Sequence, residues 1–190
     1  MMFPPRSLIP LLALASAALL TGARPAAGQL FEVKKGTITF HSNAPLELIR
    51  ASSEKLIGLL DTEKKNYAFK ISMASFKGFN SPLQGEHFNE NYVETTHYPD
   101  ASFSGKIIED DDLSADGTYT IRAKGTLTVH GIAQERIIKS TVTTKGGKVH
   151  IESNFSVMLA DHDIKIPRIV SEKLSAEVFV EVRADLEEKH

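Results

Sequence analysis

The stretch that decides the fold is TYTIRAKGTLTVHG, residues 118–131. From Tyr119 onward every second residue is apolar or glycine, and the residues between them are Thr, Arg, Lys and His. Successive side chains of a β-strand point to opposite faces, so this alternation predicts a strand with one buried and one solvated face. Strands of this kind are typical of antiparallel sheets.

The same period of two recurs along most of the chain. It is found in residues 37–40, 67–73, 103–107, 138–142, 149–157 and 178–182. Gly146 and Gly147 separate two of these stretches and predict a tight hairpin turn, because glycine takes positive φ angles easily. About eight or nine strands are expected, which makes residues 29–190 one all-β domain.

Two segments interrupt the alternation and are expected to contain short helices. In residues 43–56 the apolar residues are spaced irregularly, and Asn43 is a candidate helix cap. In residues 86–94, Phe88 and Tyr92 are four positions apart, which places both rings on one helical face.

Composition excludes several classes of function. The chain has 190 residues with 22 basic and 24 acidic side chains, a net charge of −2 and no cysteine. Without cysteine it has no disulfides, no thiolate metal site, no cysteine nucleophile and no lipidated N-terminal cysteine. A net negative charge offers no overall attraction to phosphate backbones, so no nucleic-acid partner is expected.

The N-terminus has the pattern of a secretory signal peptide, expected over residues 1–28. Arg6 precedes an apolar run at residues 8–20, and small residues follow. Cleavage is expected after Gly28, with cleavage after Ala23 as the alternative. An uncleaved membrane anchor is also open, although a run of about 13 residues is shorter than the ~20 needed to span a bilayer.

The strand pattern alone leaves the interior of the domain open. Eight antiparallel strands can close into a barrel whose lumen is either filled by side chains or holds one small ligand. Phe40, Phe69 and Phe103 lie on the apolar parity of three strands. Aromatic residues at these positions suit a packed core and a ligand cavity alike.

The pattern of polar residues does not indicate an enzyme. The histidines are scattered, no Gly-x-Ser-x-Gly motif occurs, and no pair of acids stands out. We therefore expect no catalytic residues, no metal and no cofactor. His130 lies on the polar parity beside a hairpin end and is expected to be solvated, and Asp161-His162-Asp163 favours a turn over a cation site.

Three stretches of the chain resemble the YceI family. One is residues 83–103, with His87-Phe88 and then YPDASF at residues 98–103. The second is GTLTVHG at residues 125–131, and the third is GTITF at residues 36–40. Together the resemblance extends over about residues 30–185.

This resemblance implies the fold and the function. The fold is an extended eight-stranded antiparallel β-barrel, lipocalin-like in shape, with one or two short helices. Members of the family are exported proteins that hold a polyisoprenoid chain in the lumen. The expected partner is therefore an apolar, lipid-like ligand, with a polyisoprenoid as one candidate.

We expect the lumen to be lined by residues on the apolar parity of the strands, together with one ring from the helical segment. These predicted lumen residues are Phe40, Phe69, Ile71, Phe88, Phe103, Ala123, Leu127, Val129, Phe155, Val157, Val178 and Val180. Ala123 and Gly125 are small and are expected to leave room for a ligand beside them.

The expected function is an exported carrier or scavenger, periplasmic or secreted, with no stable membrane insertion. The alternative is a structural or stress-response barrel that holds no ligand and acts through its outer surface. The two differ in whether a lipid is bound.

Overall fold

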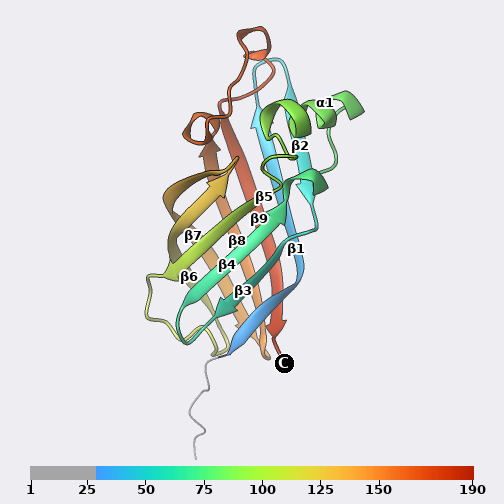
Figure 1. Cartoon of the computed structure of the whole chain (residues 1–190). Coiled ribbons are helices and arrows are strands. Elements are labelled where there is room, and N and C mark those ends of the chain that lie inside the picture. Colours follow the sequence, from blue (N-terminus) through green and yellow to red (C-terminus); the bar gives the residue numbers. More distant parts are fainter. Residues whose placement is uncertain (1–28) are drawn as a thin grey trace, which may run out of the picture.

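The computed structural model describes residues 29–190, so the expected signal peptide lies outside the described residues. Its nine strands follow one another with few interruptions (Figure 1). They are β1 (Leu30–Asn43), β2 (Leu48–Ser53), β3 (Ile57–Asp61), β4 (Asn66–Ser72), β5 (Asp100–Ile107), β6 (Gly117–Val129), β7 (Ile132–Lys145), β8 (Lys148–Met158) and β9 (Glu177–Glu188).

The strands form a closed antiparallel barrel. Strands β3 to β9 pair in sequence order, β1 pairs with β3, and β9 pairs back onto β1 from Phe31 to Ser42. Eight strands therefore close the barrel, and β2 is an additional strand on the edge of β1. The prediction of an eight-stranded antiparallel barrel is confirmed.

Short helical segments lie at one end of the barrel, which is the upper end in Figure 1. Helix α1 (Pro82–His87) continues into a single π-helical stretch, η2 (Phe88–Tyr92). Ser81 caps α1, because its hydroxyl accepts from the Gln84 amide at 3.2 Å. The helix expected in residues 86–94 is confirmed, although it begins earlier, at Pro82.

Three 3₁₀ turns complete the helical structure. They are η1 (Met73–Ser75), η3 (Leu159–His162) and η4 (Arg168–Val170). Within residues 29–190, no helix has both the length and the apolar character that crossing a membrane requires.

The prediction of a short helix within residues 43–56 is wrong. This segment is a hairpin: Ala44 and Glu47 exchange backbone hydrogen bonds at 3.0 and 3.3 Å, and β2 then pairs with β1. Ile49, Ala51 and Ser53 are buried at alternate positions of β2. Pairing along the edge of β1 satisfies the backbone of β2, and this outweighs the weak helical spacing of the apolar residues.

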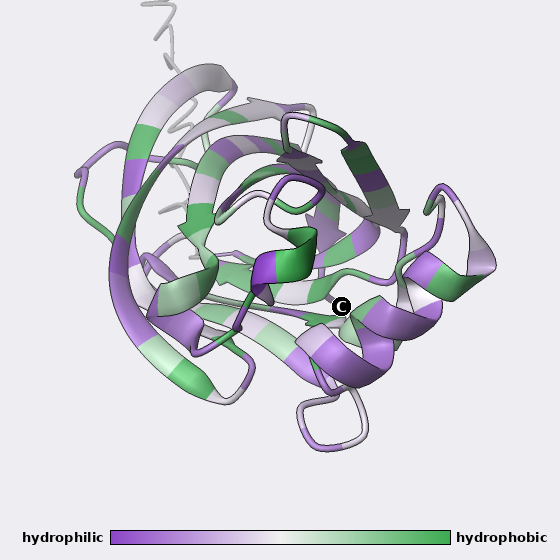
Figure 2. Cartoon of the chain, turned by 90° about the horizontal axis from the view of Figure 1, so that it is seen from above, coloured by the Kyte–Doolittle hydropathy of each residue, from purple (hydrophilic) through white to green (hydrophobic). Residues whose placement is uncertain are grey.

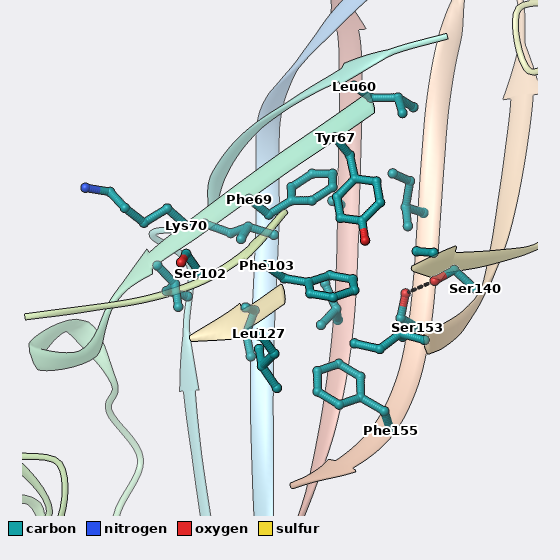
Figure 3. A pocket seen from close by; sticks show the side chains of 18 of the residues that line it. Leu60, Tyr67, Phe69, Lys70, Ser102, Phe103, Leu127, Ser140, Ser153 and Phe155 are labelled. Carbon is teal, nitrogen blue, oxygen red and sulfur yellow. Dashed lines mark hydrogen bonds between the residues drawn. The ribbon is translucent and has the colours of Figure 1, made fainter. Parts of the chain in front are cut away.

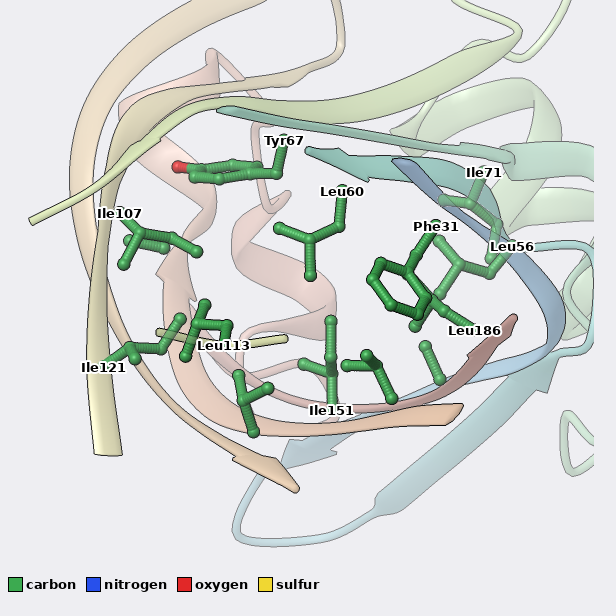
Figure 4. Close-up of a cluster of buried hydrophobic side chains, with 14 of the residues drawn as sticks. Phe31, Leu56, Leu60, Tyr67, Ile71, Ile107, Leu113, Ile121, Ile151 and Leu186 are labelled. Atoms are coloured by element: carbon green, nitrogen blue, oxygen red, sulfur yellow. The ribbon is translucent and has the colours of Figure 1, made fainter. Parts of the chain in front are cut away.

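The lower end of the barrel is closed by a packed cluster (Figure 4). Phe31, Leu60, Leu113 and Leu186 are each at most 1% exposed. Leu113 comes from the loop between β5 and β6, and the Thr144 hydroxyl fixes that loop by donating to the Leu113 carbonyl at 2.7 Å. The barrel is therefore solid at this end.

Candidate functional site

Above the packed end, the barrel interior contains two adjoining cavities. The lower cavity has a volume of about 120 Å³ and the upper cavity about 170 Å³. The two share five wall residues, which are Ile38, Ile71, Ala101, Leu127 and Phe155. They are therefore two compartments of one lumen, which is filled at one end and hollow along the rest.

The register of the strands aligns the large side chains of the lumen in rows. Phe69 of β4 is paired with Phe103 of β5, which is paired in turn with Leu127 of β6. On the other side of the barrel, Val180 of β9 is paired with both Phe40 of β1 and Phe155 of β8. Paired residues share one face of a sheet, so each row forms a continuous apolar wall.

The lower cavity lies directly above the closed end and is lined by aromatic rings (Figure 3). The Tyr67 ring packs against Phe103 with centroids 5.0 Å apart, and it stacks on Phe69 at 6.1 Å. Leu60 contributes to the floor of this cavity and also to the packed cluster below it.

The upper cavity is bounded by the helical segments, which lie at this end of the barrel when it is seen from above (Figure 2). Phe88 of η2 stacks on Phe40 of β1 with centroids 5.4 Å apart and an interplanar angle of 18°. Phe76 and Phe79 pack on the same two rings at 5.1–6.1 Å. This cluster of four rings attaches the helical segment to the barrel wall.

His130 connects two segments near the upper cavity, so the expectation that it is solvated is wrong. Its side chain is 12% exposed. Its Nδ1 lies 3.0 Å from the His162 carbonyl oxygen and its Nε2 lies 2.9 Å from Oε2 of Glu94. The hairpin end is covered by η3 and by the residues after η2, which sequence parity alone does not indicate.

The structure places all twelve predicted lumen residues on the cavity walls. The lower cavity is lined by Phe69, Phe103 and Ala123. The upper cavity is lined by Phe40, Phe88, Val129, Val157, Val178 and Val180. Ile71, Leu127 and Phe155 line both. Contact of these residues with a ligand stays a prediction.

The expectation that Gly125 leaves room for a ligand is wrong. A Cβ built on Gly125 would lie 2.4 Å from the Tyr67 hydroxyl oxygen and 2.2 Å from the Ser104 carbonyl oxygen. The space beside this glycine is therefore occupied by the Tyr67 side chain and the neighbouring strand. Ala123 does line the lower cavity.

Several wall residues were not among the predicted lumen residues. Ile38 and Tyr67 have the same parity as Phe40 and Phe69, and that signal was available in the sequence. Phe76 lies after η1, outside any strand, so no parity indicates that it faces the upper cavity.

Apart from Lys70, whose ammonium group bonds to Asp100 at the outer surface, the polar side chains that line the lower cavity carry hydroxyls. The Oγ atoms of Ser140 and Ser153 lie 2.6 Å apart on paired positions of β7 and β8. The Tyr67 hydroxyl is buried and has no hydrogen-bond partner among the described residues. Burial raises the pKa of Tyr67 above the usual value of a phenol, so its hydroxyl stays protonated and remains a donor. An unpaired buried hydroxyl costs about 1–3 kcal/mol.

The serine pair leads to a prediction about stability. Ser140→Ala is expected to lower the free energy of unfolding by about 1–3 kcal/mol, because it leaves the buried Ser153 hydroxyl without its partner. Ser140→Ala/Ser153→Ala is expected to cost no more than the single change, because both hydroxyls are then gone. Urea unfolding of the single and double variants measures this coupling.

A matched control comes from an exposed pair of the same kind. Thr118 and Thr143 bring their hydroxyl oxygens to 3.2 Å on the outer face of the barrel. Thr118→Val should change the unfolding free energy by less than about 0.5 kcal/mol. Equal effects of Ser140→Ala and Thr118→Val would contradict a role for burial.

No group of three or more His, Asp or Glu side chains within residues 29–190 is arranged to hold a metal ion. The expected turn at Asp161-His162-Asp163 is confirmed. His162 ends η3 and is fully buried, with Nδ1 lying 3.0 Å from the Ile132 carbonyl oxygen, and Asp163 takes a left-handed φ of 53°.

The barrel has the same fold as several solved structures at low sequence identity. A polyisoprenoid binding domain from Saccharophagus degradans aligns with a TM-score of 0.72 at 14% identity, covering 84% of this chain and 98% of that domain. BcnA from Burkholderia cenocepacia aligns with a TM-score of 0.65 at 15% identity, covering 79% of this chain and 95% of that protein.

A third similar structure is the YceI protein of Campylobacter jejuni, with a TM-score of 0.57 at 14% identity. That alignment covers 96% of this chain and 99% of that protein. The comparison with curated protein sequences gave no match.

Sequence comparison with protein families agrees with the fold and with the motifs at residues 36–40, 83–103 and 125–131. The family described as YceI-like domain matches residues 27–186, which is nearly the whole described chain. The chain therefore belongs to the YceI-like domain family.

Proposed function

We propose that this protein binds a long, apolar, lipid-like molecule in the lumen of its barrel, and that a polyisoprenoid chain is one such ligand. The observation that carries the proposal is the pair of adjoining apolar cavities, about 120 and 170 Å³ in volume, above a packed floor. The similar fold of a polyisoprenoid binding domain supports it.

The physical chemistry of the walls suits such a ligand. An apolar chain gains about 0.8 kcal/mol for each CH₂ that it removes from water. Apolar cavities of roughly 150 Å³ can stay dry and take up apolar molecules. The predicted lumen residues are therefore the proposed ligand contacts, and few directional polar contacts are needed.

The proposed biological role is that of an exported carrier or scavenger, periplasmic or secreted. The signal-peptide pattern of residues 1–28 supports export. We propose a binding role and not a catalytic one, without stable membrane insertion and without a nucleic-acid partner.

Native mass spectrometry of the protein purified from its own host tests the binding function. We expect a noncovalent adduct of lipid size that dissociates on activation in the gas phase. Protein that carries no adduct and takes up no added lipid would instead support a structural or stress-response barrel that acts through its surface.

The export proposal predicts the N-terminus of the mature protein. We expect cleavage after Gly28, so that the mature chain begins at Gln29, which can cyclise to pyroglutamate. The intact mass of the protein from the extracytoplasmic fraction measures this. A mass that retains residues 1–28 would contradict the export proposal.

A further inference from the structure

The lower cavity contains a hydrogen-bond donor that the protein itself does not use. Tyr67 is 6% exposed and lines this cavity, and its hydroxyl has no partner among the described residues. Figure 3 shows the hydroxyl pointing into the cavity, away from β4. A phenylalanine would bury the same ring without leaving an unpaired polar atom in the barrel.

The position of this hydroxyl follows from the residues around it. Tyr67 is paired with Gly105, and Gly105 is paired with Gly125. A Cβ on Gly125 would come within 2.4 Å of the hydroxyl oxygen. The ring also packs against Phe69 and Phe103. Close packing on these sides holds the hydroxyl at one place in the cavity.

The cavity offers a second donor from the other side. Ser140 and Ser153 share one hydrogen bond between their hydroxyls at 2.6 Å, and both residues line the lower cavity. Each hydroxyl has one hydrogen, so this bond uses one hydrogen and leaves the other. Figure 3 shows the serine pair on the wall of β7 and β8, in the same cavity as the Tyr67 hydroxyl.

Within residues 29–190, no cationic side chain in the wall of the lower cavity is placed to neutralise an anionic ligand group. Of the described residues that line the lower cavity, only Lys70 is charged. Its ammonium group lies on the outer surface and donates to Oδ2 of Asp100 at 3.0 Å. An anionic head group placed between Tyr67 and the serine pair would lose its hydration without gaining a cation, which is strongly unfavourable.

We propose that the lower cavity is a subsite for an uncharged oxygen acceptor, such as a carbonyl, at the end of the ligand that enters the barrel first. The Tyr67 hydroxyl donates to this oxygen, and the free hydroxyl hydrogen of the Ser140–Ser153 pair is the second donor. The apolar chain then extends through the upper cavity toward the helical segments. This subsite rests on the proposed function and specifies the class of ligand.

The test compares three probes with matched chain length: pentadecane, tridecyl methyl ketone and pentadecanoate. Each displaces N-phenylnaphthylamine fluorescence from the full protein after removal of co-purified lipid. We expect the ketone to bind about two- to tenfold more tightly than the alkane, the range that corresponds to one net hydrogen bond. Pentadecanoate should gain no such preference, because its carboxylate has no cation in the cavity.

Tyr67→Phe should lower the ratio of ketone affinity to alkane affinity, measured in the same variant, toward one, because the hydroxyl donor is gone. The matched control is Tyr119→Phe, because the Tyr119 hydroxyl donates to the Ala115 carbonyl at 3.0 Å and does not line either cavity. The ketone preference should persist in this control. Ser140→Ala/Ser153→Ala should reduce it.

Infrared spectroscopy of the bound, carbonyl-labelled ketone gives a measurement that needs no variant. We expect its carbonyl stretch to shift to lower frequency than in alkane solvent. Equal affinities for ketone and alkane, together with an unshifted carbonyl stretch, would overturn the subsite. Failure of both probes to displace the fluorophore would instead contradict the proposed function itself.

Discussion

Replacing Ala123 with phenylalanine is expected to weaken the binding of an apolar chain on the order of a hundredfold. Ala123 is 7% exposed and lines the lower cavity, between Ile107 and Ile138 on the neighbouring strands. A ring at this position enters space that the ligand would occupy. If it displaces three or four CH₂ groups, the loss at about 0.8 kcal/mol each corresponds to that factor.

The measurement is displacement of a hydrophobic fluorophore together with native mass spectrometry of co-purified lipid. The matched control is Thr126→Phe, which adds the same ring to the exposed face of the same strand. It should retain the ligand. Full occupancy in Ala123→Phe would show that the ligand does not reach the lower cavity.

The same variant also distinguishes a hollow lumen from a packed one. In a packed interior the extra ring causes overpacking, which typically costs about 1–3 kcal/mol of stability. In a cavity of about 120 Å³ the ring has space, so we expect a β-rich circular-dichroism spectrum and a smaller loss. A large fall in melting temperature, with no ligand ever found in the unmodified protein, would support the ligand-free alternative.

Phe31→Ala is expected to have the largest effect on stability, about 3–5 kcal/mol. Phe31 is 0% exposed and belongs to the packed cluster with Leu60, Leu113 and Leu186. Removing its ring opens a cavity among side chains that are at most 1% exposed. Folded domains are stable by only about 5–15 kcal/mol, so this is a large fraction of the total.

Urea unfolding monitored by circular dichroism measures the effect. Leu48→Ala is the control, because Leu48 is 61% exposed and should change stability by less than about 0.5 kcal/mol. A loss below about 1 kcal/mol in Phe31→Ala would contradict the interpretation of this end as a tightly packed floor.

Much of the barrel was predictable from local alternation. The side chains of a strand alternate between two faces, so the parity of Phe69, Phe103 and Leu127 indicates which face of each strand is apolar before any pairing is known. The motifs shared with the YceI family add the strand number and the closure of the barrel. For this reason the eight-stranded antiparallel barrel was predicted and is confirmed.

Alternation is less informative where the structure or the surroundings of a residue depend on partners that are distant in the sequence. The apolar side chains of residues 48–53 are irregularly spaced, and the stretch becomes β2 because the edge of β1 is available for pairing. His130 has polar parity, yet Glu94 and the His162 carbonyl bond to its ring from segments that lie more than 30 positions away in the sequence. Short-range patterns contain no information about such contacts.

The sequence by itself determined the strand faces, the all-β class and the apolar character of the lumen, because these depend on residue type and on a period of two. Only the tertiary structure decided that Leu113 and Phe31 fill one end while the rest of the lumen is hollow. It also decided that the Tyr67 hydroxyl lies unpaired over Gly125. Both features depend on how strands far apart in the sequence are placed in register around the barrel, and this is set by packing and closure of the whole sheet.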